Sequence, residues 1–85
     1  MGKLSNLTPL IRRGVVKWFD EIKGYGYIQN DNGEQVFVHF SNIIQDKGFR
    51  TLTPGTEVEF EELSGEMGPK AINVVKLPKK ILNQN

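Results

Sequence analysis

The chain has 85 residues, no cysteine and a formal net charge of +1 at pH 7. A chain of this length forms one small domain, and the absence of cysteine excludes disulfides and thiolate metal sites. No apolar run approaches the roughly 20 residues that a membrane-spanning helix needs. The N-terminal segment has no export signal, so we expect a cytoplasmic protein.

The charge is unevenly distributed. Residues 14–77 contain six Lys or Arg and ten Asp or Glu, a net charge of −4, whereas the flanking segments carry +5. Composition alone therefore does not indicate a nucleic-acid-binding protein, and any such function must depend on a local surface. We hypothesise that flexible flanks offset the acidic domain and contact phosphates through Arg12, Arg13, Lys79 and Lys80.

Strands are predicted from Gly14 onward. Residues 1–13 have no clear period, and Thr8-Pro9 disfavours a helix, so we treat them as an N-terminal extension. The apolar and aromatic run 14–20 is the first predicted strand, and the alternating segment 24–29 is the second. Asn32-Gly33 predicts a two-residue hairpin turn with positive φ at both residues. The segment 35–40 then returns as the third strand.

The second half of the chain predicts two more strands. In the connection 41–55 we expect one short helical turn and a type II turn at Pro54-Gly55. Segments 56–63 and 71–77 are predicted strands, 64–70 a loop and 78–85 a C-terminal tail.

Five short strands cannot bury a face as a flat sheet, whereas a closed barrel also removes exposed edges. We therefore predict an all-β, five-stranded antiparallel Greek-key barrel (OB-fold) at residues 14–77, with an SH3-like barrel as the alternative.

Alternation along two strands separates an inner from an outer face. Val36 and Val38 share one face with Ile28 of the preceding strand, and we expect all three in the barrel interior. Glycines 24 and 26 accompany Ile28 and suit a crowded interior or a tight bend. The outward set, which the hairpin places side by side, is Tyr25, Tyr27, Phe37 and His39.

These rings predict an exposed binding surface. Two alternatives bury them: a sheet covered on both sides, which would need helices that the sequence does not predict, and a homodimer. Each large side chain left in water forgoes roughly 1.5–3 kcal/mol of burial, so a contiguous exposed patch indicates a function. Rings mixed with Lys17, Lys23 and Arg50 match the stacking and phosphate contacts by which proteins hold single-stranded nucleic acid.

The motifs KGYGYI (23–28) and VFVHF (36–40), with VKWF, HFSNI and GFRTL in the same order, resemble the cold-shock domain of bacterial cold-shock proteins. The resemblance covers about residues 14–77. It implies an OB barrel that binds single-stranded RNA and DNA, and an RNA chaperone that destabilises RNA secondary structure and influences transcription or translation in a stress response such as cold. The binding residues that it implies are Lys17, Trp18, Phe19, Lys23, Tyr25, Tyr27, Phe37, His39, Phe40, Phe49 and Arg50, with Phe40 at the edge.

Because of four departures from the family pattern, the base preference of the family is less transferable to this chain than binding itself. Tyr25 and Tyr27 stand where Phe is usual, so each ring gains a hydroxyl. Asp20 replaces a common Asn and adds a charge near the expected path of the ligand. Gln35 replaces a common Asp, and Met67 stands where a basic residue is frequent.

Two rival functions remain open. An enzyme would need a partnered nucleophile, but His39 is the only histidine and nothing beside it indicates one. A barrel that binds proline-rich peptides on its rings is compatible with the composition, although the neighbouring lysines favour nucleic acid. We therefore expect no catalytic residue, no cofactor and no metal. The expected partners are single-stranded RNA and DNA, and the expected state is a monomer, with a dimer as the alternative.

Overall fold

The computed structural model describes residues 10–45, 48 and 50–78. This part of the chain forms five strands and one short 3₁₀ helix and contains no α-helix. No helix within it is long and apolar enough to cross a membrane. The elements are β1 (Leu10–Asp20), β2 (Tyr25–Asn30), β3 (Gln35–His39), η2 (Phe40–Asn42), β4 (Glu57–Gly65) and β5 (Gly68–Lys76).

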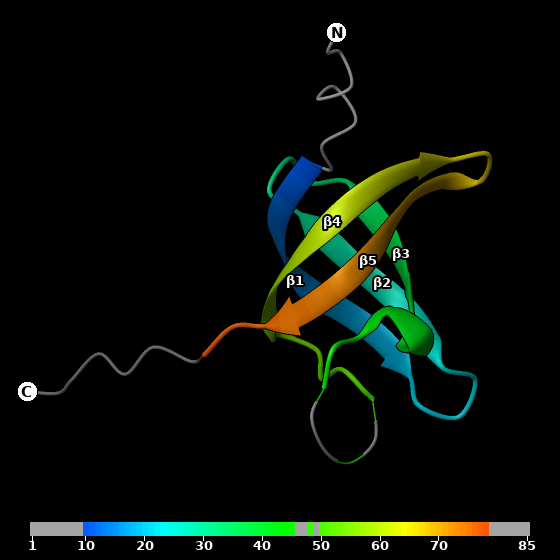
Figure 1. The fold of residues 1–85 in the computed structure, drawn as a ribbon, viewed down its shortest axis with the longest axis vertical. Coiled ribbons are helices and arrows are strands. Elements are labelled where there is room, and N and C mark those ends of the chain that lie inside the picture. Colours follow the sequence, from blue (N-terminus) through cyan, green and yellow to red (C-terminus); the bar gives the residue numbers. More distant parts are fainter. Residues whose placement is uncertain (1–9, 46–47, 49, 79–85) are drawn as a thin grey trace, which may run out of the picture.

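The five strands close into a barrel in the order β1-β2-β3-β5-β4, so the predicted all-β barrel is confirmed (Figure 1). Four of the neighbouring pairs are antiparallel, and β3 pairs with β5 in parallel. The barrel was predicted as antiparallel, and the β3–β5 pair is the one exception to that description. A ring with an odd number of strands cannot alternate direction at every step, so closure with five strands requires one parallel pair.

The interior is filled by small and medium apolar side chains, which alternation predicted for β2 and β3. Ile28, Val36 and Val38 have no exposed surface, and Phe60 is the largest buried side chain. Ile43 and Leu52 come from the connection between η2 and β4 and belong to the same cluster. The whole buried cluster is Val16, Ile28, Val36, Val38, Ile43, Leu52, Val58, Phe60, Ala71 and Val74.

The first strand begins four residues earlier than the sequence indicated. It starts at Leu10, and its first half pairs with β4, so residues 10–13 belong to the barrel and not to a flexible flank. The sequence showed no period here because Leu10 and Ile11 are both exposed and are followed by two consecutive arginines, so buried and exposed positions do not alternate.

The two arginines of this segment contact acidic residues of the barrel. Arg12 Nη1 lies 2.7 Å from Asp31 Oδ1, and its Nε lies 3.4 Å from Glu62 Oε1. The hydrogen bond to Asp31 raises the pKa of Arg12 above its ordinary value. Arg13 Nε lies 3.5 Å from Glu59 Oε2. The expectation that these arginines extend on a flexible flank is therefore wrong, and Lys79 and Lys80 lie outside the described residues.

The β2–β3 hairpin is confirmed, but its predicted turn type is wrong. Only Gly33 has a positive φ (83°), and Asn32 does not. The loop is instead organised by Asn30, which is 4% exposed. Its Oδ1 accepts hydrogen bonds from the backbone N–H groups of Asn32 and Glu34, at 3.0 and 2.8 Å. Its Nδ2 donates to the carboxylates of Glu34 and Glu62, both at 3.0 Å.

The remaining turns agree in part with those that the sequence predicted. Gly55 has φ 94°, and the N–H of Thr56 donates to the carbonyl of Thr53 at 3.0 Å, as a type II turn requires. The helix η2 supplies the expected helical turn. Most of the predicted loop 64–70 is strand, because β4 and β5 continue as a long hairpin that extends beyond the barrel (Figure 1).

The four hydrogen bonds of Asn30 predict a measurable share of the stability. Asn30→Ala should lower the free energy of unfolding by about 2–4 kcal/mol, because two backbone donors and two carboxylates lose their partner. Asn30→Asp keeps the acceptor but places a third carboxylate beside Glu34 and Glu62. It should destabilise the protein at neutral pH, and part of the loss should be recovered in acid as carboxylates are protonated. Urea unfolding at several pH values measures both effects, and an unchanged midpoint would contradict this role.

Candidate nucleic-acid interface

Six aromatic side chains gather on the outer side of β1, β2 and β3. Register pairs Trp18 with Tyr27, Tyr27 with Phe37 and Tyr25 with His39, so their side chains share one face. The 3₁₀ helix η2 begins at Phe40, directly after His39. We call this surface the aromatic face; it consists of Trp18, Tyr25, Tyr27, Phe37, His39 and Phe40.

Four rings of the aromatic face, Trp18, Tyr25, Tyr27 and Phe37, contact one another in a continuous network. Trp18 lies 5.8 Å from Tyr25 and 6.1 Å from Tyr27, measured between ring centroids, and is stacked at 28° on Tyr27. Phe37 lies 5.8 and 6.1 Å from the same two tyrosines. These separations are typical of favourable aromatic pairs. The contacts hold the rings in place while Trp18 remains 44% exposed, so the face offers ring surface that is already ordered.

A β-bulge in β1 turns Trp18 outward. The register moves from Val16 opposite Ile28 to Trp18 opposite Tyr27, which leaves Lys17 as an extra residue. Strict alternation from the buried Val16 would point Trp18 into the barrel. Because of the bulge, Lys17 and Trp18 are both exposed, and bulges commonly redirect side chains in this way.

Phe19 follows the bulge and is placed differently from the other predicted rings. It is half-buried and packs against the core cluster. Gly26 pairs with Phe19 across the strands. A Cβ at Gly26 would clash with the backbone carbonyl oxygen of Trp18 and lie 2.6 Å from Phe19 Cα. Glycine at this position therefore lets β1 and β2 approach closely beside the bulge. Phe19 therefore packs toward the core, and its role as a direct contact stays a prediction.

His39 and Phe40 form the edge of the aromatic face. Their ring centroids are 4.6 Å apart, and Phe40 is 41% exposed. His39 Nδ1 accepts the backbone N–H of Ser41 at 3.3 Å and lies 2.8 Å from its hydroxyl. In the neutral ring this contact places the proton on Nε2, which leaves an N–H donor away from the helix. The edge of the face therefore offers a stacking ring together with a polar group.

Cationic side chains accompany some of the rings. Lys17 lies at the bulge beside Trp18, and Lys23 lies in the turn just before Tyr25. Both are exposed, as is Arg50, in agreement with the prediction from sequence. Lys70 was not predicted: the parallel register places it opposite Phe37, while the next pair, Val38 and Ala71, points inward. Lys70 therefore lies on the outer side beside Phe37. Residue 70 was predicted to lie in a loop, and the parallel closure of the barrel brings it to this face.

Two further residues named in the sequence analysis, Asp20 and Phe49, have distinct outcomes. The Asp20 carboxylate is occupied within the β1–β2 turn, where Oδ1 accepts the backbone N–H groups of Ile22 and Lys23, both at 2.9 Å. These two hydrogen bonds hold the carboxylate within the turn. Phe49 lies outside the described residues, so its expected contact stays a prediction.

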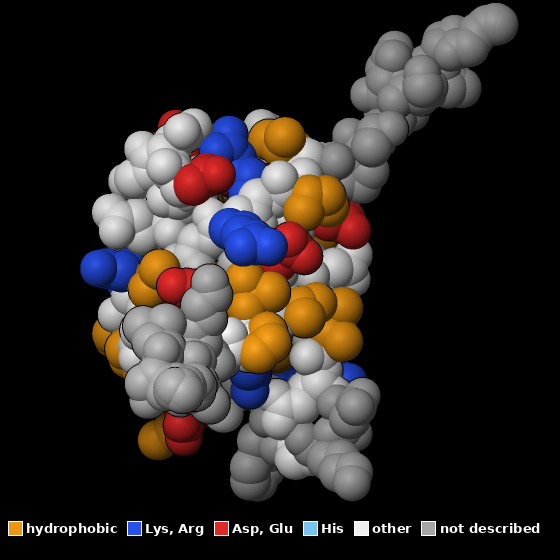
Figure 2. All heavy atoms as spheres, turned by 90° about the vertical axis from the view of Figure 1, so that its left-hand side faces the viewer, with side chains coloured by type: hydrophobic (Ala, Val, Ile, Leu, Met, Phe, Trp, Pro, Cys, Tyr) orange, Lys and Arg blue, Asp and Glu red, His pale blue; other side chains and the backbone are white. Residues whose placement is uncertain are grey.

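The acidic residues of β4 do not lie among the rings of the aromatic face. Glu57, Glu59 and Glu61 pair across to β1 and β5, not to β2 or β3. On the side shown in Figure 2, basic and acidic side chains lie beside one another above a group of hydrophobic side chains. The net negative charge of the domain is therefore not concentrated at the aromatic face.

A family model described as the 'Cold-shock' DNA-binding domain matches residues 12–77. The chain belongs to this cold-shock domain family. The predicted family is thereby confirmed. As a member of it, the protein binds nucleic acid, and the closed five-stranded barrel is the OB-fold of the family.

Relatives with cold-shock names cover most of the chain. Cold shock protein CspB of Bacillus caldolyticus is 55% identical over 67 residues, which span 79% of this chain and 100% of that protein. Cold shock-like protein CspC of Bacillus cereus is 52% identical over 65 residues, or 76% of this chain and 98% of that protein. The major cold shock protein of Streptococcus pyogenes serotype M1 is 49% identical over 65 residues, with coverages of 76% and 96%.

The position of Phe40 in this cold-shock domain depends on Gly24. This glycine has φ 81°, and a Cβ on it would lie 2.6 Å from the Phe40 ring. Gly24→Ala should therefore lose about 1–2 kcal/mol of stability through backbone strain and also displace Phe40. Affinity for oligo-dT, followed by Trp18 fluorescence, should fall by roughly 1 kcal/mol, the lower value for one stacked base.

Gly33 provides the matched control for this substitution. It has φ 83°, but nothing lies within 4 Å of a Cβ there. Gly33→Ala should show a similar loss of stability with unchanged affinity. Equal affinities of the two variants would mean that the Gly24–Phe40 contact does not matter for binding.

Proposed function

We propose that this protein binds unpaired RNA and DNA on its aromatic face and acts as an RNA chaperone. The observation that carries the proposal is the network of outward rings, in which each of Trp18, Tyr25, Tyr27 and Phe37 contacts two others. An exposed apolar network of this kind lowers stability unless a ligand covers it.

The geometry favours single strands over duplexes. A flat ring can stack on an unpaired base, whereas bases within a duplex already stack on one another. Stacking of one base on one ring contributes about 1–3 kcal/mol and accepts any base. Lys17, Lys23 and Lys70 border the rings at positions suited to backbone phosphates. A protein that binds only the unpaired form shifts the equilibrium of an RNA hairpin toward that form, which is the proposed chaperone activity.

The proposed setting is cold stress in the cytoplasm. The relatives carry cold-shock names. RNA secondary structure becomes more stable as temperature falls, so a protein that holds RNA unpaired is most useful at low temperature. Influence on transcription or translation would follow from the same melting of RNA structure. We further propose that the protein acts as a monomer and has binding, not catalysis, as its role.

The proposal predicts which substitutions weaken binding without unfolding the protein. Trp18→Ala, Tyr27→Ala and Phe37→Ala should each lower affinity for oligo-dT by about 1–3 kcal/mol. Stability should change little, because these rings are exposed or half-buried outside the core. Fluorescence anisotropy with labelled oligo-dT, oligo-U and a blunt duplex measures the binding.

The duplex is the decisive comparison in this experiment. Oligo-dT and oligo-U should both bind, and the duplex should bind much more weakly. Equal affinity for duplex and single strand would refute stacking as the mode of binding. Binding of a PxxP peptide on the same rings, with none of oligo-dT, would favour the peptide-binding alternative.

Lys70 predicts a specific salt dependence. If it contacts one phosphate, Lys70→Gln should reduce the slope of log K against log salt by about 0.7 for a single-stranded ligand. Lys76→Gln is the matched control, because Lys76 donates a 2.8 Å hydrogen bond to Gln45 on another part of the barrel. Parallel lines for wild type and Lys70→Gln would show that Lys70 does not contact the ligand.

A further inference from the structure

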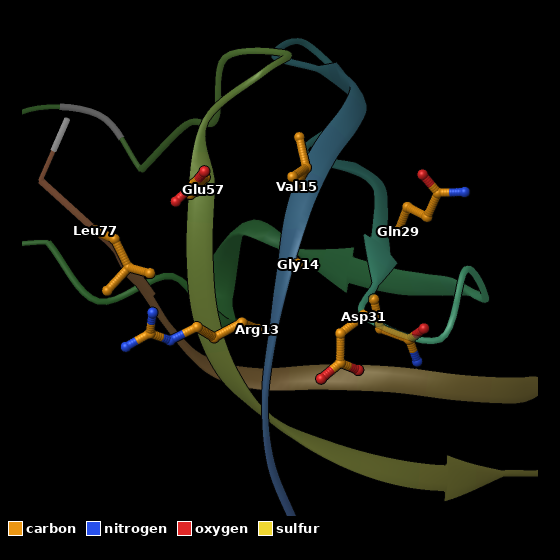
Figure 3. A pocket seen from close by; sticks show the side chains of 8 residues that line it. Arg13, Gly14, Val15, Gln29, Asp31, Glu57 and Leu77 are labelled. Atoms are coloured by element: carbon orange, nitrogen blue, oxygen red, sulfur yellow. The ribbon is translucent and has the colours of Figure 1, made fainter. Parts of the chain in front are cut away.

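A shallow groove lies beside the aromatic face, and the binding surface described above does not include it. It has a volume of about 290 Å³, at the lower limit of small-molecule sites. Figure 3 shows Arg13 and Leu77 on one side of β1 and Gln29 and Asp31 on the other, with Val15 on the strand. The lining residues are Arg13, Gly14, Val15, Gln29, Asn30, Asp31, Glu57 and Leu77.

The groove continues the aromatic face along β1 and β2. Trp18 pairs with Tyr27, and the next outward pair toward the groove is Val15 with Gln29. Lys17 is exposed at the bulge between these two pairs. A single strand that stacks on Trp18 and runs on in this direction therefore passes Lys17 and then enters the groove.

The groove offers both apolar surface and hydrogen-bond acceptors. Val15 and Leu77 are half-buried and present apolar surface suited to the flat side of a base. Gln29 Nε2 lies 3.5 Å from the carbonyl of Gly33, which leaves its Oε1 as an acceptor. Asp31 holds Arg12 through Oδ1, and a carboxylate has capacity for further hydrogen bonds. Glu57 adds a second exposed carboxylate.

One cation in the groove is available to a backbone phosphate. The Arg13 side chain is 69% exposed, and its contact with Glu59 is long, at 3.5 Å. A long, exposed ion pair contributes little, so a phosphate can displace it at low energetic cost. The groove therefore combines the features that one nucleotide needs: surface for the base, acceptors at its edge and a cation for its phosphate.

We propose that this groove is an additional subsite for one nucleotide and that it selects a base bearing an exocyclic amino group. This inference rests on the proposed binding of single strands to the aromatic face. Cytosine and adenine present an amino group as a hydrogen-bond donor, whereas the corresponding group of thymine is a carbonyl acceptor. Acceptors from Gln29, Asp31 and Glu57 favour the amino group and disfavour the carbonyl. The stacking rings themselves do not distinguish bases in this way.

The test compares oligonucleotides that differ by one terminal nucleotide. The ligands are a short oligo-dT that covers the aromatic face and the same oligo-dT with one added dC or dT at the 5′ or the 3′ end. Trp18 fluorescence gives the dissociation constants. At one of the two ends, dC should bind about three- to tenfold more tightly than dT, as expected for one or two net hydrogen bonds.

Substitutions in the groove should abolish the preference and leave oligo-dT binding intact. Gln29→Ala removes one acceptor, and Asp31→Asn replaces a carboxylate oxygen by a donor while keeping an acceptor for Arg12. Gln35→Ala is the matched control, because Gln35 pairs with Gln29 on the same outer side but does not line the groove. The control should retain the preference for dC.

The outcomes separate the two proposals. Equal affinity for dC and dT at both ends, or a preference for dC that survives Gln29→Ala and Asp31→Asn, would overturn the groove subsite and leave the aromatic face unaffected. No binding of oligo-dT would overturn both.

Discussion

The whole arrangement depends on the bend in β1. This strand pairs with β4 along its first half and with β2 along its second half, and the bulge at Lys17 lies in the second half. The close approach of backbones at Gly26 is part of the same bend. One irregularity therefore helps to close the barrel, turns Trp18 outward and leaves Lys17 beside it. The binding surface and the closure of the fold are consequences of the same local geometry.

The sequence predicted the features that depend on local alternation. The inward Val36 and Val38 and the outward Phe37 and His39 follow from a period of two within one strand. The bulge was not predictable in this way, because an extra residue changes the period without a distinctive residue type. The contacts of Arg12 and Asn30 were also missed, since their partners on β4 lie 50 and 32 residues further along the chain. Such contacts exist only once the strand order is known.

The distribution of charge explains how an acidic domain can present a surface for a polyanion. Several carboxylates are engaged within the protein: Asp20 by its turn, Glu34 by Asn30, and Glu62 by Asn30 and Arg12. Others lie on β4, away from the rings. Net charge is therefore a poor guide to this protein, because the potential that a ligand meets depends on the groups beside the aromatic face.

The parallel pairing of β3 with β5 also has a consequence for synthesis of the protein. During translation β1, β2 and β3 emerge before β5, so the rings of the aromatic face are present while β3 still lacks one neighbour. Barrel closure must wait for residues 68–76, and such late, non-local pairing is a slow step in folding. Lys70 arrives with that last strand. A nascent chain that stops before it would carry the rings without the finished barrel, and its competence for binding would appear only once residues 68–76 have emerged.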